Sequence, residues 1–376
     1  MDKSIGFIKK EYKPYGGAER YLAMIMERMV LEGYQVHLYA SKWTGLREGI
    51  TVHRVRNLRL GSAASALSFN RNVRASVSRQ RPDCLMSFER TTSGEVYRAG
   101  DGVHRQWLRL RRSVEGTVKG LSFGLNPLHR ALLSIEREIF EKTPIIVANS
   151  NMVKREIIEH YGVPEKRLRV IHNGVDLEGF NPRLRDSGQG LELKRQMGIN
   201  EKTKILLFVG TGFERKGLGV LLEALALLKA DEPVLLVAGR GRLMPYEQQC
   251  ARLGLQRRVR FLGPTDEIAR LYAASDLFVL PTLYDPFSNA TIEAMASGLG
   301  VVTTSNNGAS ELIEESVEGC ITHELASAPE LAQAMERALM DSEAMGLRAR
   351  AKAEQYPIEK AVAAFIALLK ECGTGG

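Results

Sequence analysis

Short apolar runs of β-strand length alternate with helix-like segments along almost the whole chain. The first runs are residues 5–8 and 36–40, and residues 18–32 between them carry apolar side chains at the three- and four-residue intervals of a helix. A strand, a helix and a second strand within about 35 residues form a βαβ unit. This pattern predicts a parallel sheet with right-handed crossovers, so we expect an α/β protein.

A second alternating series follows a polar stretch at residues 181–190. Its first run, 205–209, is apolar at every position, which is typical of a strand buried on both faces. Four more strand-like runs and four helical patterns follow it, and three helical patterns close the chain. We therefore predict two Rossmann-like, doubly wound parallel-sheet domains that face a cleft. Ligands of such domains bind at the carboxyl ends of the strands.

The composition is that of a soluble globular protein, with 376 residues of which 44% are hydrophobic and 26% charged. No apolar run reaches the roughly 18 residues that span a bilayer. The first residues lack the apolar region of a signal peptide, so we expect a cytosolic protein. The four cysteines, Cys84, Cys250, Cys320 and Cys372, are far apart and include no C-x-x-C pair. We expect buried or idle thiols, and neither a zinc site nor a disulfide framework.

Positive charge is concentrated in one part of the chain. Residues 54–130 contain fifteen Lys and Arg against five Asp and Glu, whereas the whole chain has a net charge of +8, so this stretch carries the entire excess. Such a stretch points to an anionic partner, which can be nucleic acid, acidic lipid headgroups or a phosphorylated substrate. A solvated basic surface without a partner gives the same pattern.

Two glycine-containing loops join a strand to a helix. Gly16 and Gly17 follow the first strand, where the backbone can approach a ligand and the helix N-terminus attracts an anion. Residues 210–217 match neither a Walker A loop nor the G-x-G-x-x-G fingerprint. Instead they place Arg215 and Lys216 at a helix start, where cations oppose the helix dipole. An anionic ligand explains these two cations better than helix stability does.

Residues 281–298 combine acidic side chains with another helix start. Asp285 lies in a loop after a strand, and Glu293 lies in the following helix with seven residues between them. The backbone amides of residues 288–291 are the free donors of that helix start. This one segment therefore offers two carboxylates for sugar hydroxyls and several amides for a phosphate.

This acidic-x7-acidic segment resembles the signature of retaining glycosyltransferases of family 4 (glycosyl transferases group 1), which have the GT-B fold. Residues 147–150, 170–176 and 260–281 match the same family, and the resemblance covers nearly the whole chain. Within the family the chain is most similar to the bacterial lipopolysaccharide core glucosyltransferases. The features shared with that group are residues 14–17, residues 41–45 with Trp43, residues 99–101 and residues 213–217.

The resemblance implies how the leaving diphosphate is stabilised. Gly16 and Gly17 would approach the diphosphate and sugar of the donor, and Arg215 and Lys216 would neutralise the diphosphate as it leaves. Enzymes that clamp a sugar nucleotide with a metal need closely spaced aspartates, and the sequence contains no Asp-x-Asp. We therefore expect a metal-independent reaction without a cofactor, and the family implies retention of anomeric configuration.

The resemblance also implies which residues hold the rest of the donor. Glu293 would bind the nucleotide ribose and Asp285 the sugar hydroxyls, although the family usually has glutamate where Asp285 stands. The shorter aspartate side chain affects which donor hydroxyls it can reach, and hence which sugar is accepted. The other expected donor-binding residues are Leu262, which frames the base, and Phe287, Ser288, Asn289 and Ala290.

The acceptor is expected in the first domain. Asp101 and His104 lie where the family has a polar residue near the acceptor hydroxyl, and we favour Asp101 as the group that orients or deprotonates it. Residues 104–128 mix cations with Trp107 and several leucines, a composition that suits an anionic membrane surface. No nucleic-acid-binding motif accompanies the charge, so nucleic acid ranks below lipid.

Together these observations predict a GT-B transferase with two domains. Residues 1–180 form the acceptor-binding domain and residues 181–356 the donor-binding domain. A helix in residues 357–376 crosses back to the first domain. We expect it to move glucose from UDP-glucose to a lipid-linked glycan such as the lipopolysaccharide inner core, at the cytoplasmic face of a membrane. The alternatives are a transferase that uses GDP-mannose or UDP-GlcNAc, a nucleotide-sugar 2-epimerase, and a non-catalytic basic protein that binds lipid or nucleic acid.

Overall fold

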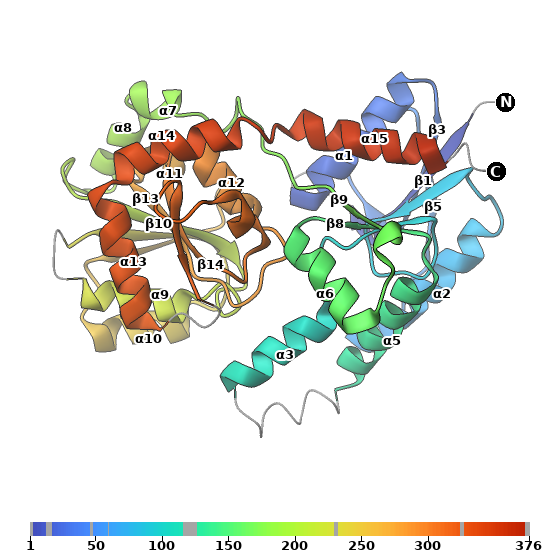
Figure 1. The fold of residues 1–376 in the computed structure, drawn as a ribbon, viewed down its shortest axis with the longest axis horizontal. Helices are drawn as coiled ribbons and strands as arrows, with labels where there is room; N and C mark the ends of the chain where they lie inside the picture. Colours follow the sequence, from blue (N-terminus) through green and yellow to red (C-terminus); the bar gives the residue numbers. More distant parts are fainter. Residues whose placement is uncertain are drawn as a thin grey trace. The chain divides into compact units, whose positions relative to one another are not determined.

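The computed structural model describes residues 3–12, 17–45, 48–58, 60–115, 126–228, 232–323 and 327–372. The chain divides into two compact units (Figure 1). Unit 1 consists of Met1–His172 together with Glu359–Gly376, and unit 2 is Asn173–Ile358.

Unit 1 is built on a seven-stranded parallel sheet in the order β5-β3-β1-β6-β7-β8-β9. Its strands are β1 (Ser4–Ile8), β3 (Gln35–Ala40), β5 (Ile50–Arg54), β6 (Cys84–Ser87), β7 (Val96–Arg98), β8 (Ile145–Ala148) and β9 (Leu168–Val170). Strands β2 (Glu11–Tyr12) and β4 (Lys42–Trp43) form a separate parallel pair. The helices are α1 (Gly17–Leu31), α2 (Ser62–Val77), α3 (His104–Glu115), α5 (Pro127–Lys142), α6 (Asn151–Tyr161), the 3₁₀ turn η1 (Glu165–Arg167) and α15 (Ile358–Cys372).

Unit 2 is built on a six-stranded parallel sheet in the order β12-β11-β10-β13-β14-β15. Its strands are β10 (Ile205–Thr211), β11 (Val234–Arg240), β12 (Val259–Gly263), β13 (Leu277–Leu280), β14 (Gly300–Thr304) and β15 (Gly319–Thr322). Its helices are α7 (Arg183–Asp186), α8 (Gln189–Gln196), α9 (Leu218–Leu227), α10 (Met244–Leu253), α11 (Ile268–Ala274), α12 (Asn289–Ala296), η2 (Gly308–Leu312), α13 (Ala328–Met340) and α14 (Ser342–Ala353).

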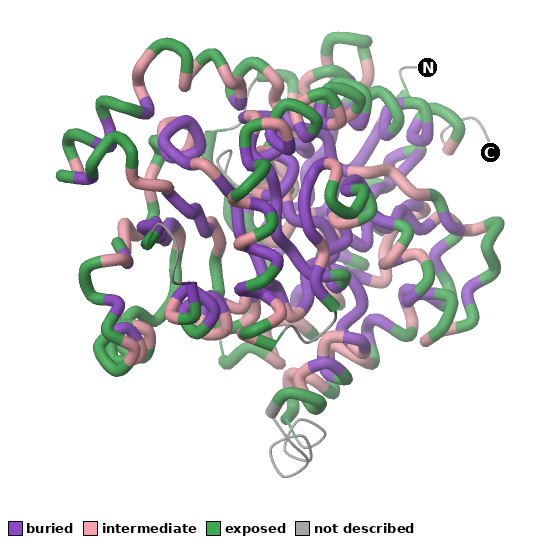
Figure 2. Tube along the Cα trace, turned by 60° about the vertical axis from the view of Figure 1, so that its left-hand side comes forward, coloured by how far each residue is buried: buried purple, intermediate pink, exposed green. Residues whose placement is uncertain are grey.

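The apolar runs of the sequence form the central strands of both sheets. Ile205, Leu206, Leu207 and Phe208 of β10 are fully buried, because neighbouring strands and the helices on both faces cover them. Figure 2 shows long buried stretches of the chain with more exposed stretches around them. The structure therefore confirms two doubly wound parallel-sheet domains. None of the helices in the described part of the chain is long and apolar enough to cross a membrane.

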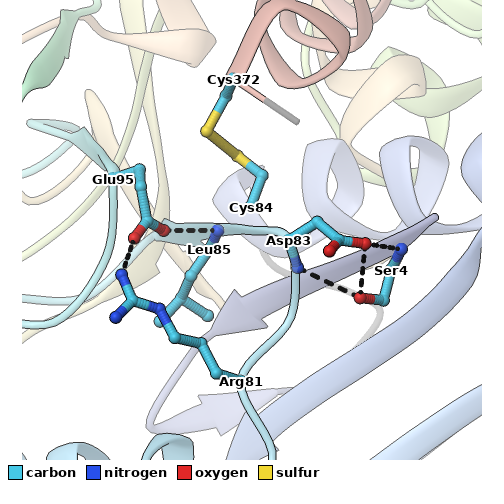
Figure 3. The surroundings of a disulfide bond; sticks show 7 residues. All are labelled: Ser4, Arg81, Asp83, Cys84, Leu85, Glu95 and Cys372. Carbon is cyan, nitrogen blue, oxygen red and sulfur yellow. Dashed lines mark hydrogen bonds and ion pairs between the residues drawn. A yellow bond between two sulfur atoms is a disulfide. The ribbon is translucent and has the colours of Figure 1, made fainter. Parts of the chain in front are cut away.

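One expectation about the cysteines is wrong. Cys84 at the start of β6 and Cys372 at the end of α15 form a disulfide, with Cα atoms 5.8 Å apart (Figure 3). The two residues are separated by 288 positions, so spacing alone contains no sign of the pairing. They meet because α15 packs on unit 1, where its Phe365 and Leu369 are buried. Cys250 and Cys320 are buried free thiols, as expected.

Candidate functional site

The loop after β10 is held in a conformation that requires glycine at its last position. Gly217 has φ of +77°, and a Cβ there would collide with the backbone carbonyl of Pro281. Two residues before Gly217, the carbonyl of Arg215 accepts hydrogen bonds from Leu283 N at 2.8 Å and from Thr282 Oγ1 at 3.0 Å. The loop at residues 210–217 and the segment after β13 therefore form one local structure at the carboxyl ends of these strands.

Lys216 and Asp285 form a buried ion pair between these two segments. Lys216 is 8% exposed and Asp285 6% exposed. Burial lowers the pKa of Lys216, and Arg215 adds to this effect, while the Asp285 carboxylate opposes it. The sequence predicted separate ligand contacts for these two residues, whereas in the structure each is the other's partner.

Arg215 is half-buried beside this pair. Its Nη1 donates to the carbonyl oxygen of Tyr284 at 3.0 Å, and no carboxylate among the described residues pairs with it. A guanidinium has five N–H donors, so most of those on Arg215 are available to an anion. Two cations thus stand at the start of α9, as the sequence predicted.

The segment that contains Asp285 is fixed by Asn307, which the sequence analysis missed. The Asn307 Oδ1 accepts from Ser288 N at 3.2 Å and from Ala309 N at 3.1 Å, and its Nδ2 donates to the hydroxyls of Thr291 (2.9 Å) and Thr303 (3.0 Å). All four of these hydrogen bonds are buried. The polar run of residues 305–307 directly after a strand was the available signal.

The backbone of the same segment is held by the loop after β14. Asp285 N donates to the carbonyl of Asn306 at 2.9 Å, and Gly308 N donates to the carbonyl of Asp285 at 2.8 Å. Ser288 then caps α12 by accepting from Thr291 N. Phe287 is buried, whereas Asn289 and Ala290 are half-buried at the start of the helix.

Glu293 lies one turn further along α12 and is half-buried. Its Oε2 accepts from the hydroxyl of Tyr272 at 3.3 Å, and the same hydroxyl lies 3.0 Å from the carbonyl of Ala290. Burial and the Glu293 carboxylate both raise the pKa of Tyr272. Tyr272, a second residue that sequence analysis missed, therefore positions this carboxylate.

The other predicted donor-binding residues belong to other parts of the chain. Leu262 lies half-buried in β12. Gly17 is the first residue of α1 in unit 1. Gly16 lies outside the described residues.

In unit 1, the two acceptor candidates lie on either side of a buried charge cluster. Asp101 is exposed, and its carboxylate lies 3.7 Å from the guanidinium of Arg90. That guanidinium also donates to the carbonyls of Asp101 (3.3 Å) and Gly102 (3.2 Å), and lies 3.7 Å from the buried carboxylate of Glu136. Glu136 accepts in turn from His104 N at 2.6 Å, which fixes the start of α3.

His104 has a structural position. Its side chain is buried, and its Nε2 lies 3.1 Å from Nδ1 of His129. Burial, with the nearby Arg90 and His129, lowers the pKa of His104 to about 3. The ring is therefore neutral near pH 7 and already has a partner, while Asp101 remains exposed.

The expected membrane-facing stretch is described only in part, because residues 116–125 lie outside the described ranges. In α3, Leu108 and Leu110 are buried and Trp107 is half-buried under Arg111, whose guanidinium lies 5.6 Å from its ring centre. Arg109 and Arg112 are exposed. Cations rather than leucines therefore dominate the exposed surface of this helix. No group of three or more potential metal ligands occurs among the residues that the structure describes.

Comparison with known families agrees with this geometry and with the resemblance inferred from sequence. Residues 15–178 match the model described as Glycosyltransferase Family 4, and residues 203–341 match that described as Glycosyl transferases group 1. The first match covers most of unit 1 and ends just inside unit 2, and the second lies within unit 2; together they span most of the chain. The chain belongs to the family-4 glycosyltransferases, which have the GT-B fold.

Two relatives show how similar the chain is to individual glycosyltransferases. The chain is 25% identical over 350 residues to the lipopolysaccharide glucosyltransferase WaaG of Escherichia coli K12, a match that covers 90% of each chain. It is 33% identical over 178 residues to an uncharacterized glycosyltransferase of Methanocaldococcus jannaschii, where the match covers 46% of this chain and 45% of the relative. The chain thus spans less than half of that relative's length.

Solved structures share the fold. A crystal structure of WaaG superposes with a TM-score of 0.85 at 22% identity and covers 99% of this chain and all of that chain. A structure of Anabaena HepE in complex with UDP-glucose superposes with a TM-score of 0.72 at 21% identity and covers 98% and 99%.

Proposed function

We propose that this protein is a retaining, metal-independent glycosyltransferase that moves glucose from UDP-glucose to a lipid-linked glycan such as the lipopolysaccharide inner core. The observation that carries the proposal is the pair of cations, Arg215 and Lys216, held at the start of α9 against the segment of Asp285. The similarity to WaaG supports the acceptor class, and the UDP-glucose bound by HepE supports the donor.

The cations act on the charge that develops during transfer. As the bond between the anomeric carbon and the β-phosphate oxygen breaks, negative charge grows on the diphosphate. Arg215 and Lys216 stabilise that charge without a divalent ion, because both are already held in place by the surrounding chain. The carbonyl of Tyr284 orients Arg215, and the Asp285 carboxylate opposes the lowering of the Lys216 pKa that burial causes.

The positions of the side chains support the remaining contacts that we propose. The half-buried Glu293, oriented by Tyr272, binds the ribose hydroxyls. Asp285 accepts from sugar hydroxyls with the carboxylate oxygen that Lys216 leaves available. Asn289 and Ala290 present the N-terminus of α12 to a phosphate, while Ser288, whose amide donates to Asn307, caps the helix. Leu262 frames the base.

The acceptor hydroxyl attacks from the face that the leaving group occupies, which retains the anomeric configuration. Its proton passes to the departing phosphate oxygen, and the new bond joins the acceptor oxygen to the anomeric carbon. Asp101 orients this hydroxyl, because it is exposed beside Arg90 whereas His104 is buried against His129. We place the enzyme at the cytoplasmic face of a membrane, where the exposed Arg112 of α3 attracts anionic lipid, next to Arg109, which is paired with Glu159 at 3.0 Å.

Calorimetric titration of UDP, GDP and ADP in EDTA tests the donor site. We compare the wild type with Arg215→Gln, because the Arg215 side chain makes one hydrogen bond to the described residues and its loss disturbs folding less than that of the buried Lys216 side chain. The matched control is Arg252→Gln, an exposed arginine on α10. UDP should bind without metal, and only the Arg215 variant should weaken binding, by about tenfold or more. Failure of every nucleotide to bind would refute the proposal, as would equal binding by both variants.

A further inference from the structure

The disulfide between Cys84 and Cys372 joins the start of β6 to the last residue of α15 and takes no part in the proposed transfer reaction. The 288 positions that separate the two cysteines include the whole of unit 2. A bond between such distant positions forms readily only where the fold places both sulfur atoms side by side. The contacts around each cysteine therefore decide whether the bond can open and close again.

Cys84 is held in place by its two neighbours in the chain, independently of the disulfide (Figure 3). The carboxylate of Asp83 accepts from the amide and the hydroxyl of Ser4 at 2.7 and 2.9 Å, and the amide of Asp83 donates to the carbonyl of Ser4 at 3.0 Å. On the other side, Leu85 N donates to the carboxylate of Glu95 at 2.9 Å. These hydrogen bonds do not involve the sulfur atom, so Cys84 keeps its position when the S–S bond breaks.

Cys372 is held by the packing of α15, which does not depend on the disulfide either. Phe365 is 1% exposed, and Leu369, within one turn of Cys372, is fully buried. Between Leu369 and Cys372, Lys370 Nζ lies 2.6 Å from the carboxylate of Glu32, which directly follows α1. Because α15 contacts unit 1 as far as its last turn, both thiols of the reduced protein remain close to each other.

The two cysteines differ in exposure. Cys84 is 0% exposed, whereas Cys372 is half-buried at the end of its helix. A thiolate from solution therefore reaches the disulfide at Cys372. The other two cysteines, Cys250 and Cys320, are buried free thiols of unit 2.

We propose that Cys84 and Cys372 form a reversible redox site, at which dithiol reductants and small disulfides such as glutathione disulfide exchange with the protein through Cys372. The oxidised site locks the end of α15 onto unit 1, and the reduced site allows that end to open. This inference does not depend on the proposed glycosyltransferase function, and its tests measure no transfer.

Reduction of the redox site proceeds by thiol–disulfide exchange. One thiolate of a dithiol reductant attacks Sγ of Cys372, the S–S bond breaks, and its electron pair leaves on Sγ of Cys84, which takes up a proton. The second thiolate of the reductant then attacks the mixed disulfide and releases Cys372, which is protonated in turn. The protein gains two electrons and two protons, and the reductant becomes a disulfide. Glutathione disulfide reverses the reaction, because Cys372 forms a mixed disulfide and Cys84 then displaces the second glutathione.

The point of attack is tested with Cys84→Ser and Cys372→Ser, each of which leaves one cysteine of the redox site. Glutathione disulfide is added to the folded full-length variants, and mass spectrometry follows the glutathione adducts. Cys372 in the first variant should react at least about tenfold faster than Cys84 in the second, since reactivity requires access. The buried Cys250 and Cys320 are controls within the same chains and should stay unmodified. Equal rates at Cys372 and Cys84 would overturn Cys372 as the point of attack.

An equilibrium measurement on the wild type tests whether the fold positions the two thiols. The protein is equilibrated with mixtures of reduced and oxidised glutathione, both folded and in guanidinium chloride, and the disulfide is quantified by alkylation and mass spectrometry. The equilibrium constant for forming it should be at least about thirtyfold larger in the folded protein, and should be the same when approached from either state. Equal constants in the folded and unfolded protein would overturn the proposal, whether or not the two variants fold.

Hydrogen exchange tests whether the redox site locks α15. Wild-type protein is compared before and after reduction with dithiothreitol, with β10 and β13 of unit 2 as the control. Reduction should accelerate exchange in the last two turns of α15 by about tenfold or more and leave the control strands unchanged. Unchanged exchange in α15 would overturn the lock. Equal acceleration in the control strands would overturn it too, because it would show unfolding of the whole protein instead of opening of this helix.

Discussion

Breaking the buried pair between Lys216 and Asp285 should destabilise unit 2 in a way that a second substitution partly reverses. Lys216→Met replaces the lysine by an uncharged side chain of similar length. The Asp285 carboxylate is then buried without its cation. Removal of one partner from a buried ion pair costs about 3–5 kcal/mol. Since both residues are less than 10% exposed, we expect a cost in that range.

Adding Asp285→Asn to Lys216→Met gives a double variant in which the unpaired carboxylate is replaced by a neutral amide. The double variant should therefore be more stable than Lys216→Met alone by about 2 kcal/mol or more, because a neutral amide is much less costly to bury than a carboxylate. Lys202→Met, at an exposed lysine of unit 2, is the matched control and should change stability by less than about 0.5 kcal/mol.

Hydrogen exchange measured by mass spectrometry suits this test, because it reports each unit separately. Both tryptophans, Trp43 and Trp107, belong to unit 1, so tryptophan fluorescence checks that unit 1 is unchanged. A loss of 3–5 kcal/mol should accelerate exchange of the slowest amides in β10 and β13 by about a hundredfold to a thousandfold or more. Acceleration below about fivefold in Lys216→Met would refute the reasoning. So would a double variant whose cost equals the sum of the two single costs.

Three further predictions concern other parts of the structure. Gly217→Ala should weaken UDP binding in calorimetry, because a Cβ collides with the carbonyl of Pro281 and displaces the loop of Arg215; unchanged binding would contradict this. Cys372→Ser should lower the thermal stability of unit 1 by about 2–4 kcal/mol under oxidising conditions and leave it unchanged in dithiothreitol, where the Cys84 bond is absent in both proteins. His104 has a depressed pKa of about 3, so its contribution to the stability of unit 1 is complete above about 6.5 and is lost as the pH falls toward 3. The midpoint of thermal unfolding, followed by tryptophan fluorescence, should vary less with pH over that range in a His104→Asn variant than in the wild type. An equal pH dependence in both proteins would contradict the assignment of a depressed pKa to His104.

The alternation of strands and helices could be predicted because parallel strands buried on both faces leave a direct trace in sequence. Runs such as residues 205–209 are apolar throughout, and the structure places them in the middle of a sheet. The pair β2 and β4 left no such trace, since each strand has two residues. Strands were therefore predictable where burial requires an apolar side chain at every position. They were missed where two strands pair over only two residues.

The candidate site was predictable as a set of loops but not as a set of contacts. Arg215, Lys216 and Asp285 could be selected because they follow strands at the edge where α/β proteins bind ligands. Their mutual pairing, and the hydrogen bonds of Asn307 that hold the segment, depend on residues distant in sequence. The same holds for the disulfide between Cys84 and Cys372, which only the packing of α15 brings together.

The disulfide bears on the expected compartment. A reducing cytosol keeps most thiols unpaired, so the expectation of a cytosolic protein predicts that Cys84 and Cys372 are reduced in the cell. The buried Phe365 and Leu369 keep α15 packed on unit 1 in either state. Alkylation of cells before lysis, followed by mass spectrometry of these two cysteines, distinguishes the two states.

The most direct test of the central claim is proton NMR of UDP-glucose incubated with the protein in EDTA, where water serves as the acceptor. We expect slow release of UDP together with α-glucose as the first anomer. The Arg215→Gln variant should release UDP only at the rate of a control without protein. Appearance of β-glucose as the first anomer, or release of UDP only after a divalent metal is restored, would contradict the assignment of a retaining transferase that relies on its own cations.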